Sequence, residues 1–283
     1  IGIFDSGVGG LSVLKEARRI LPAEDFLYFS DNAYCPYGDK DQDLILERAR
    51  EITDFLIFKG ADIIVVACNT ATAAAISALR EEYSQPLERI RMISGGRIDH
   101  VKFIGMEPAV KPAALGTRTG VIGVLATAGT LSASKYLNTK GQYQDDAVIE
   151  EHIGEGFVEL VESGQWSGDR AREVVKASLQ PLLDAGADTI VLGCTHYPFL
   201  KPVIEKIGGE GKEYWVRDRN YPFDPAFLAN EQRMAEKSGR GTYFGRWRVE
   251  ISKPQESSEA RFLNVISVGD TYMTKPFKTR RLK

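Results

Sequence analysis

Cysteine and histidine are scarce in this sequence of 283 residues, which contains three of each. They are Cys35, Cys68, Cys194, His100, His152 and His196. A small and odd number of cysteines argues against a disulfide framework and indicates a reducing compartment, so we expect a cytoplasmic protein. The spacing of these cysteines and histidines matches no zinc motif, and we therefore expect no metal site.

Long apolar runs and a strong excess of charge are also absent. No run approaches the roughly 18 apolar residues of a membrane helix, and the opening residues show no secretory signal pattern. The net charge of −3 predicts no attraction to nucleic acid or to anionic membranes. The length allows one large or two ordinary domains. Because a strand is already under way at Ile1, we expect a few residues to precede it.

Short β-branched runs alternate with longer helical patterns, which is typical of parallel α/β layers. In the first half, the pattern predicts strands at residues 1–4, 26–29 and 63–67 and helices at 11–21, 44–59 and 70–83. In the second half, it predicts strands at 119–125 and 189–192 and helices at 174–185, at 198–207 and from about residue 131.

One nine-residue segment occurs twice. Residues 60–68 read GADIIVVAC and residues 186–194 read GADTIVLGC, so each copy is a mostly apolar strand that ends in a cysteine. The stretch IGIFDSGVGGLS from Ile1 also aligns loosely with IGVLATAGTLS from Ile122. We therefore predict two pseudo-symmetric α/β domains, with mainly parallel sheets that face a central cleft. Since ligands bind beyond the carboxyl ends of such strands, each domain would bring one thiol to a shared site.

Two thiols on opposite sides of one carbon suit a reaction that removes and returns a proton. A lone cysteine in an apolar strand is more often a small core residue, but Cys68 and Cys194 are duplicated and run into polar turns. The helices that follow are expected to lower a thiol pKa. Asp5 and His196 are candidates for assisting the thiols, although Asp5 could instead cap a helix and His196 could lie in a loop.

The turn SGVGG at residues 6–10 fits neither a mononucleotide nor a dinucleotide fingerprint. Backbone N–H groups at a helix start can bind an anion, so we interpret this turn as a cradle for a ligand carboxylate.

Four blocks of the sequence, in the family's order, resemble the bacterial glutamate racemases. They are FDSGVGG at residues 4–10, DNAYCPYG at 31–38, ACNTATA at 67–73 and LGCTHYPFL at 192–200. The resemblance covers roughly residues 1–86 and 105–207. It implies an isomerase that needs no cofactor or pyridoxal phosphate, interconverts L- and D-glutamate and supplies D-glutamate for peptidoglycan, cell-wall biogenesis and cell shape. It also implies that a homodimer is plausible.

The same resemblance assigns roles to individual residues. It implies that Cys68 deprotonates D-glutamate and Cys194 deprotonates L-glutamate, with Asp5 and His196 supporting proton transfer. Beside Asp5 and His196, the implied substrate-binding residues are Ser6, Pro36, Tyr37, Gly38, Asn69, Thr70 and Thr195. Asp31 and Glu162 match acidic positions near the site, whereas Cys35 is not expected to be catalytic.

The sequence departs from the family pattern in three places. Residues 87–104 are longer than the short strand expected there, and Gly154-Glu155-Gly156 stands where the family has Ala-Cys-Pro. The apolar strand and closing helix expected after Ile207 are hard to find. We predict a first domain at 1–104, a second at 105–208, and an atypical, partly disordered segment at 209–283 that returns to the first domain.

Three alternative functions stay open. An aspartate or hydantoin racemase of the same fold would use the same two thiols, although THYPF after Cys194 points to glutamate. A cysteine-nucleophile hydrolase would use Cys194 with His196 as base, but it leaves the duplicated Cys68 unexplained. A non-catalytic binding protein could retain the site without productive closure.

Overall fold

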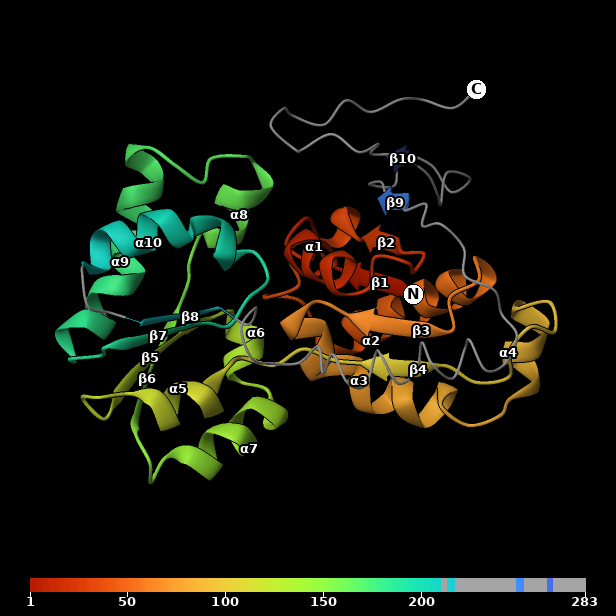
Figure 1. Cartoon of the computed structure of the whole chain (residues 1–283), viewed down its shortest axis with the longest axis horizontal. Coiled ribbons are helices and arrows are strands. Elements are labelled where there is room, and N and C mark those ends of the chain that lie inside the picture. The colour runs from red at the N-terminus through yellow and green to blue at the C-terminus, as the bar shows by residue number, and fades with distance from the viewer. Residues whose placement is uncertain (210–212, 217–247, 252–263, 267–283) are drawn as a thin grey trace.

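The computed structural model describes residues 1–209, 213–216, 248–251 and 264–266. These residues form two sheets that lie in two halves of the molecule, each covered by helices (Figure 1). The prediction of a two-part α/β fold with mainly parallel sheets is confirmed.

The first sheet has the strand order β10-β9-β2-β1-β3-β4, and all neighbours are parallel except β9 and β10. Its strands are β1 Gly2–Asp5, β2 Leu27–Ser30, β3 Ile63–Val66, β4 Lys102–Ile104, β9 Arg248–Ile251 and β10 Asn264–Ile266. The helices of this half are α1 Leu11–Ile20, the 3-10 helix η1 Asn32–Tyr34, α2 Gln42–Phe58, α3 Asn69–Tyr83 and α4 Glu88–Ile93.

The second sheet has the order β6-β5-β7-β8, with all neighbours parallel. Its strands are β5 Val121–Ala126, β6 Val148–Ile153, β7 Thr189–Leu192 and β8 Glu213–Val216. The helices of this half are α5 Val110–Gly116, α6 Ala128–Leu131, α7 Ser134–Tyr143, α8 Phe157–Glu162, α9 Asp169–Asp184, the 3-10 helix η2 Tyr197–Leu200 and α10 Lys201–Gly208.

Helices cover both faces of each sheet, which explains why the central strands are apolar at nearly every position. On β1, Phe4 packs in one core with α2 and α3, and its neighbour Ile3 packs in another core with α1. On β7, Ile190 packs with α8, α9 and α10, and Val191 packs with α5 and α7.

The two copies of the repeated segment occupy equivalent places. Strand β3 pairs with β1, the first strand of its sheet in the sequence, and β7 pairs with β5, the first strand of the other sheet. In the first pair Ile3 lies opposite Val65, and in the second Val124 lies opposite Val191. The two copies of the repeated sequence therefore occupy equivalent positions in the two sheets.

Most predicted elements lie within a few residues of the observed ones, because clear boundary signals frame them. Helix α2, predicted at 44–59, begins after Asp41, whose carboxylate accepts a hydrogen bond from the Asp43 N–H at 2.8 Å. After this helix, Gly60 has a φ of 107°, a conformation that favours glycine. Helix α9, predicted from residue 174, begins earlier, at Asp169.

Two of the segments that depart from the family pattern, residues 87–104 and the chain after Ile207, contain regular secondary structure. The extra length at residues 87–104 is taken up by α4 and the strand β4. The strand that was hard to find after Ile207 is present as β8, which pairs in parallel with β7. The expected closing helix and the predicted disorder concern residues that lie largely outside the described ranges.

Among the described residues, none of the helices has the length and apolar character needed to cross a membrane.

Candidate active site

The carboxyl ends of the central strands meet where the two halves touch. Asp5 ends β1, Cys68 follows β3 and Cys194 follows β7. The Thr195 hydroxyl donates to Asp5 Oδ1 at 3.1 Å across this boundary. The hydroxyls of Thr70 and Thr127 lie 3.0 Å apart across the same boundary. The predicted meeting of two strand ends is therefore present as direct side-chain contacts.

Cys68 is a buried thiol at the start of α3. Its side chain is the N-terminal cap of that helix and accepts a hydrogen bond from the Ala71 N–H at 3.4 Å. The thiol itself donates toward Ser6 Oγ at 3.9 Å. Burial, followed by the negative charge of Asp5, raises the pKa of Cys68 to about 12. The Ala71 N–H at the helix N-terminus lowers this pKa in the expected direction, but desolvation and the charge of Asp5 outweigh it, so no net lowering results.

Cys194 has an imidazole beside it rather than a carboxylate. Its Sγ lies 3.7 Å from His196 Nδ1, and the opposite ring nitrogen, Nε2, lies 2.6 Å from Glu162 Oε1. Burial lowers the pKa of His196, but its hydrogen bonds to two thiols and a carboxylate outweigh burial and hold this pKa well above its ordinary value. Burial raises the pKa of Glu162, but the hydrogen bond and the charge of His196, together with the hydrogen bonds of Val8 and Cys35, outweigh burial, so this pKa is lowered. The buried ring and the partly buried carboxylate thus form an ion pair.

Asp5 is fully buried and joins the two halves. Its Oδ2 accepts the N–H groups of Gly7 and Gly10, each at 3.1 Å, while Oδ1 accepts the Thr195 hydroxyl. Burial raises the pKa of Asp5, and the charge of His196 acts in the opposite direction. The carboxylate therefore supports the turn that follows β1. It does not cap α1, whose N-terminal cap residue is Gly10.

The turn at residues 6–10 holds carboxylates, but they belong to the protein. Two of its N–H groups bind Asp5, and the Val8 N–H donates to Glu162 Oε1 at 2.7 Å. The interpretation of this turn as a cradle for a ligand carboxylate is therefore wrong for these three N–H groups. They fix the two acidic side chains of the site instead.

The polar candidates for substrate binding surround the thiols. Ser6, Asn69, Thr70 and Thr195 are all buried. Pro36 and Gly38 are half-buried in the loop after η1, and the Gly38 carbonyl accepts the Gly129 N–H from the other half at 3.0 Å.

Tyr37 and Asp31 form a separate contact. The Tyr37 hydroxyl donates to Asp31 Oδ2 at 2.6 Å. Arg48 binds both oxygens of the same carboxylate, at 3.0 and 2.9 Å. The Asp31 side chain is therefore engaged in fixing this loop to α2.

Sequence reasoning missed Thr127 and Thr130. The two hydroxyls lie 3.0 Å apart, and both approach Thr70, from which Thr130 is 3.4 Å distant. A signal was present in the sequence, because the loose alignment of residues 1–12 with the stretch from Ile122 pairs Ser6 with Thr127. These threonines add hydroxyl groups from the second half to the site.

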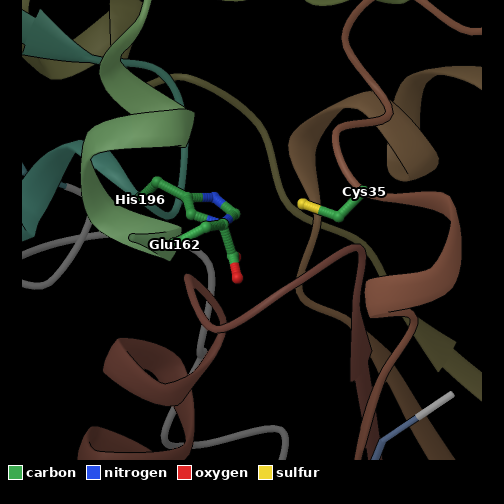
Figure 2. A group of neighbouring side chains, drawn as sticks. All are labelled: Cys35, Glu162 and His196. Atoms are coloured by element: carbon green, nitrogen blue, oxygen red, sulfur yellow. The ribbon is translucent and has the colours of Figure 1, made fainter. Parts of the chain in front are cut away.

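Cys35 also reaches the site, although its loop is distant in sequence. Ligand atoms of Cys35, Glu162 and His196 all lie within 4.8 Å of one another (Figure 2). Burial raises the pKa of the Cys35 thiol, and its hydrogen bond to His196 acts against this rise. The sequence spacing gave no sign of this cluster, since folding alone brings its three segments together.

Comparisons with known proteins agree with this geometry. A family model for Asp/Glu/Hydantoin racemases matches residues 97–209. The chain is 47% identical over 207 residues to the glutamate racemase of Pseudomonas paraeruginosa, covering 73% of this chain and 72% of that one. It is also 47% identical over 205 residues to the glutamate racemase of Pseudomonas putida strain F1, covering 72% and 71%.

Solved structures give the same answer. This structure superposes on that of the Escherichia coli glutamate racemase, crystallised with L-glutamate and the activator UDP-MurNAc-ala, with a TM-score of 0.70 and 30% sequence identity. The superposition covers 90% of each of the two chains. The Thermus thermophilus glutamate racemase, in complex with β-chloro-D-alanine, has a TM-score of 0.66 at 34% identity, covering 92% of this chain and 89% of that one. The chain belongs to the glutamate racemase family of isomerases.

Proposed function

We propose that this protein interconverts L- and D-glutamate by passing the α-proton between Cys68 and Cys194. The observation that carries the proposal is the duplicated strand–cysteine unit, whose two thiols are buried where the halves meet. Proton transfer to and from opposite faces of one carbon needs two such groups, one acting as base and the other as acid.

The two thiols have different neighbours. Cys68, with a pKa of about 12, is a protonated thiol at neutral pH and is suited to deliver a proton. Cys194 instead has the His196 ring as a neighbour, with Nδ1 at 3.7 Å from its Sγ, and this ring can serve as its acid–base partner. In the L-to-D direction, Cys194 would therefore remove the α-proton of L-glutamate and Cys68 would protonate the opposite face. The reverse direction would exchange these roles.

Substrate positioning would rest on the polar groups around the thiols. We assign the carboxylates of glutamate to the hydroxyl and amide groups of Ser6, Asn69, Thr70 and Thr195, and to backbone groups of Pro36, Tyr37 and Gly38. Asp5 and His196 would assist proton transfer, and Glu162 would hold the His196 ring. The hydroxyls of Thr127 and Thr130 extend the same polar surface.

The first test is proton exchange at the α-carbon. L-Glutamate and L-aspartate are incubated together with the folded protein in D₂O, and each α-proton signal is followed by NMR. We expect the glutamate signal to disappear and the aspartate signal to persist. Loss of the aspartate signal alone would assign the protein to a sister racemase, and persistence of both signals would contradict racemase activity.

A hydrolase remains the second candidate, because Cys194, His196 and Glu162 are arranged as nucleophile, base and orienting carboxylate. Single Cys68→Ser and Cys194→Ser variants distinguish the two. A racemase should lose about 10²- to 10⁴-fold in rate with either change. A hydrolase should tolerate Cys68→Ser. Cys35→Ser is the matched control, since it removes a neighbouring thiol that has no assigned part in proton transfer.

The remaining proposals concern organisation and context. We propose domains at residues 1–104 and 105–208, the second extended by β8, which pairs with β7, and we propose that the rest of the segment 209–283 returns to the first. The pairing of β9 with β2 supports that return. We also propose a cytoplasmic homodimer that supplies D-glutamate for peptidoglycan. Light scattering of the purified chain tests the dimer directly.

A further inference from the structure

We propose that Cys35, Glu162 and His196 form an inhibitory binding site for a thiophilic divalent cation such as Zn²⁺. One ligand atom from each residue lies within 4.8 Å of the others. The cation site itself stands independently of the racemase proposal, whereas its inhibitory effect rests on that proposed function.

The donor set matches the chemistry of zinc. Thiolate sulfur, imidazole nitrogen and carboxylate oxygen are the ligands that Zn²⁺ prefers in proteins, at about 2.0 to 2.3 Å from the metal. The ligand atoms of one tetrahedral site therefore lie less than about 4 Å apart. A separation of at most 4.8 Å requires only small side-chain movements. Three protein ligands leave a fourth position for water or a substrate group.

The ligands come from both halves of the molecule. Cys35 follows η1 in the first half, Glu162 ends α8 and His196 precedes η2 in the second. Figure 2 shows the Cys35 sulfur directed toward the imidazole and the carboxylate from the opposite side. A bound cation would therefore link the two halves.

Neighbouring groups already hold two of the ligands in place. Glu162 accepts hydrogen bonds from the Val8 N–H at 2.7 Å and from Asn32 Nδ2 at 3.3 Å. The Nδ1 atom of His196 faces Cys194, so the ring presents Nε2 to Glu162 and the cluster. Such outer partners orient metal ligands and strengthen binding. Access from solvent is available, because Cys35 is partly exposed and the Glu162 side chain is 19% exposed.

Binding would stop the reaction in two ways. A cation on Nε2 replaces the proton that His196 shares with Glu162, and the thiol proton of Cys35 is released to the buffer. With the metal on Nε2, the ring beside Cys194 can no longer exchange a proton with Glu162. In addition, the link between the halves opposes any separation needed to admit glutamate.

Co²⁺ provides a direct test on the full chain, because thiolate coordination to Co²⁺ produces a charge-transfer absorption band. Metal-free protein is titrated with Co²⁺, and Zn²⁺ is then added as a competitor. We expect a band at one Co²⁺ per chain that Zn²⁺ abolishes. Cys35→Ser should remove the band and weaken Zn²⁺ binding at least about 100-fold, more than the loss of an outer-shell partner costs. Cys68→Ser is the matched control and should keep the band.

Activity provides the second readout. Zn²⁺ should inhibit the wild-type racemase, EDTA should restore it, and Cys35→Ser should be active and resistant. A band that survives Cys35→Ser, or the absence of any band, would overturn the site. Equal inhibition of Cys35→Ser would overturn the inhibitory role. Failure of racemisation itself would leave the Co²⁺ result intact, so the two proposals fail separately.

Discussion

The Thr195 hydroxyl donates to Asp5 Oδ1 at 3.1 Å, joining two residues that lie 190 positions apart. The other carboxylate oxygen of Asp5 accepts the Gly7 and Gly10 N–H groups. One buried side chain therefore fixes both the turn after β1 and the loop after β7. Each half of the protein consequently contributes to the site at the boundary between the halves.

Replacing Asp5 with asparagine tests this link. In Asp5→Asn the amide oxygen can still accept the Gly7 and Gly10 N–H groups while the NH2 group faces the Thr195 hydroxyl, so we expect the free energy of unfolding to change by no more than about 1 kcal/mol. Racemisation should fall by about 10²-fold or more if Asp5 also assists proton transfer. Urea denaturation and circular dichroism of glutamate measure the two effects. The exposed Asp145→Asn change is the control, and unchanged activity in Asp5→Asn would remove Asp5 from the mechanism.

The reactivity of Cys68 should show its raised pKa. With a pKa of about 12, this thiol is almost fully protonated at pH 7. Since the thiolate is the nucleophile, alkylation by iodoacetamide should be slow and should rise about tenfold per pH unit up to pH 10. Peptide mapping by mass spectrometry at several pH values follows the reaction.

The unfolded chain serves as the control for this measurement. There, Cys68 should titrate near the ordinary cysteine pKa of about 8.5, and its alkylation should level off above it. A similar plateau in the folded protein would contradict the burial argument.

The central strands could be predicted from sequence because both of their faces are buried. Strands β3 and β7 are apolar runs framed by glycine and cysteine, so their repeat was visible. Strand β6 was missed, because Glu150, Glu151 and His152 interrupt its apolar pattern at the edge of the sheet. Edge strands carry too few apolar residues for a periodicity argument to find them.

Sequence periodicity and repeats could identify the two duplicated cysteine motifs of the site but not the contacts that the other side chains make there. Cys68 and Cys194 could be paired, but their different electrostatic surroundings depend on which side chains meet after folding. Burial against Asp5 governs Cys68, whereas His196 and Glu162 surround Cys194. The approach of Cys35 to His196 likewise follows from the contact between the halves, which no sequence spacing encodes.

Asp188 should make stability depend on pH. Burial raises its pKa, but hydrogen bonds led by that of the Thr117 hydroxyl, at 2.6 Å, outweigh burial and lower the pKa to about 2. A carboxyl whose pKa is lower in the folded than in the unfolded state stabilises the fold above the unfolded value, about 4. This contribution is lost as the pH falls from about 4 to 2.

The Asp188→Asn variant tests that dependence. At pH 7 it should lose about 1 to 3 kcal/mol in the free energy of unfolding, because the N–H groups of Arg118 and Thr119 lose a charged acceptor. Near pH 2 the difference from the wild type should shrink. Urea denaturation at both pH values measures it. A difference that stays constant with pH would show that Asp188 has an ordinary pKa.

Because Gly9 has no side chain, the His196 ring can lie directly against its backbone. A Cβ atom at residue 9 would lie 2.4 Å from His196 Nδ1, so Gly9→Ala must displace the ring or the turn. Since Nδ1 faces Cys194 at 3.7 Å, we expect racemisation to fall by about 10²-fold, the cost of a misplacement of about 1 Å.

Gly141→Ala is the matched control for Gly9→Ala. Gly141 lies in α7 with no atom within 4 Å of its added Cβ, so this change should stabilise the helix by up to about 1 kcal/mol and leave activity unchanged. Steady-state kinetics and urea denaturation of both variants separate catalysis from stability. If Gly9→Ala folds stably and keeps full activity, the position of the His196 ring is not required for proton transfer.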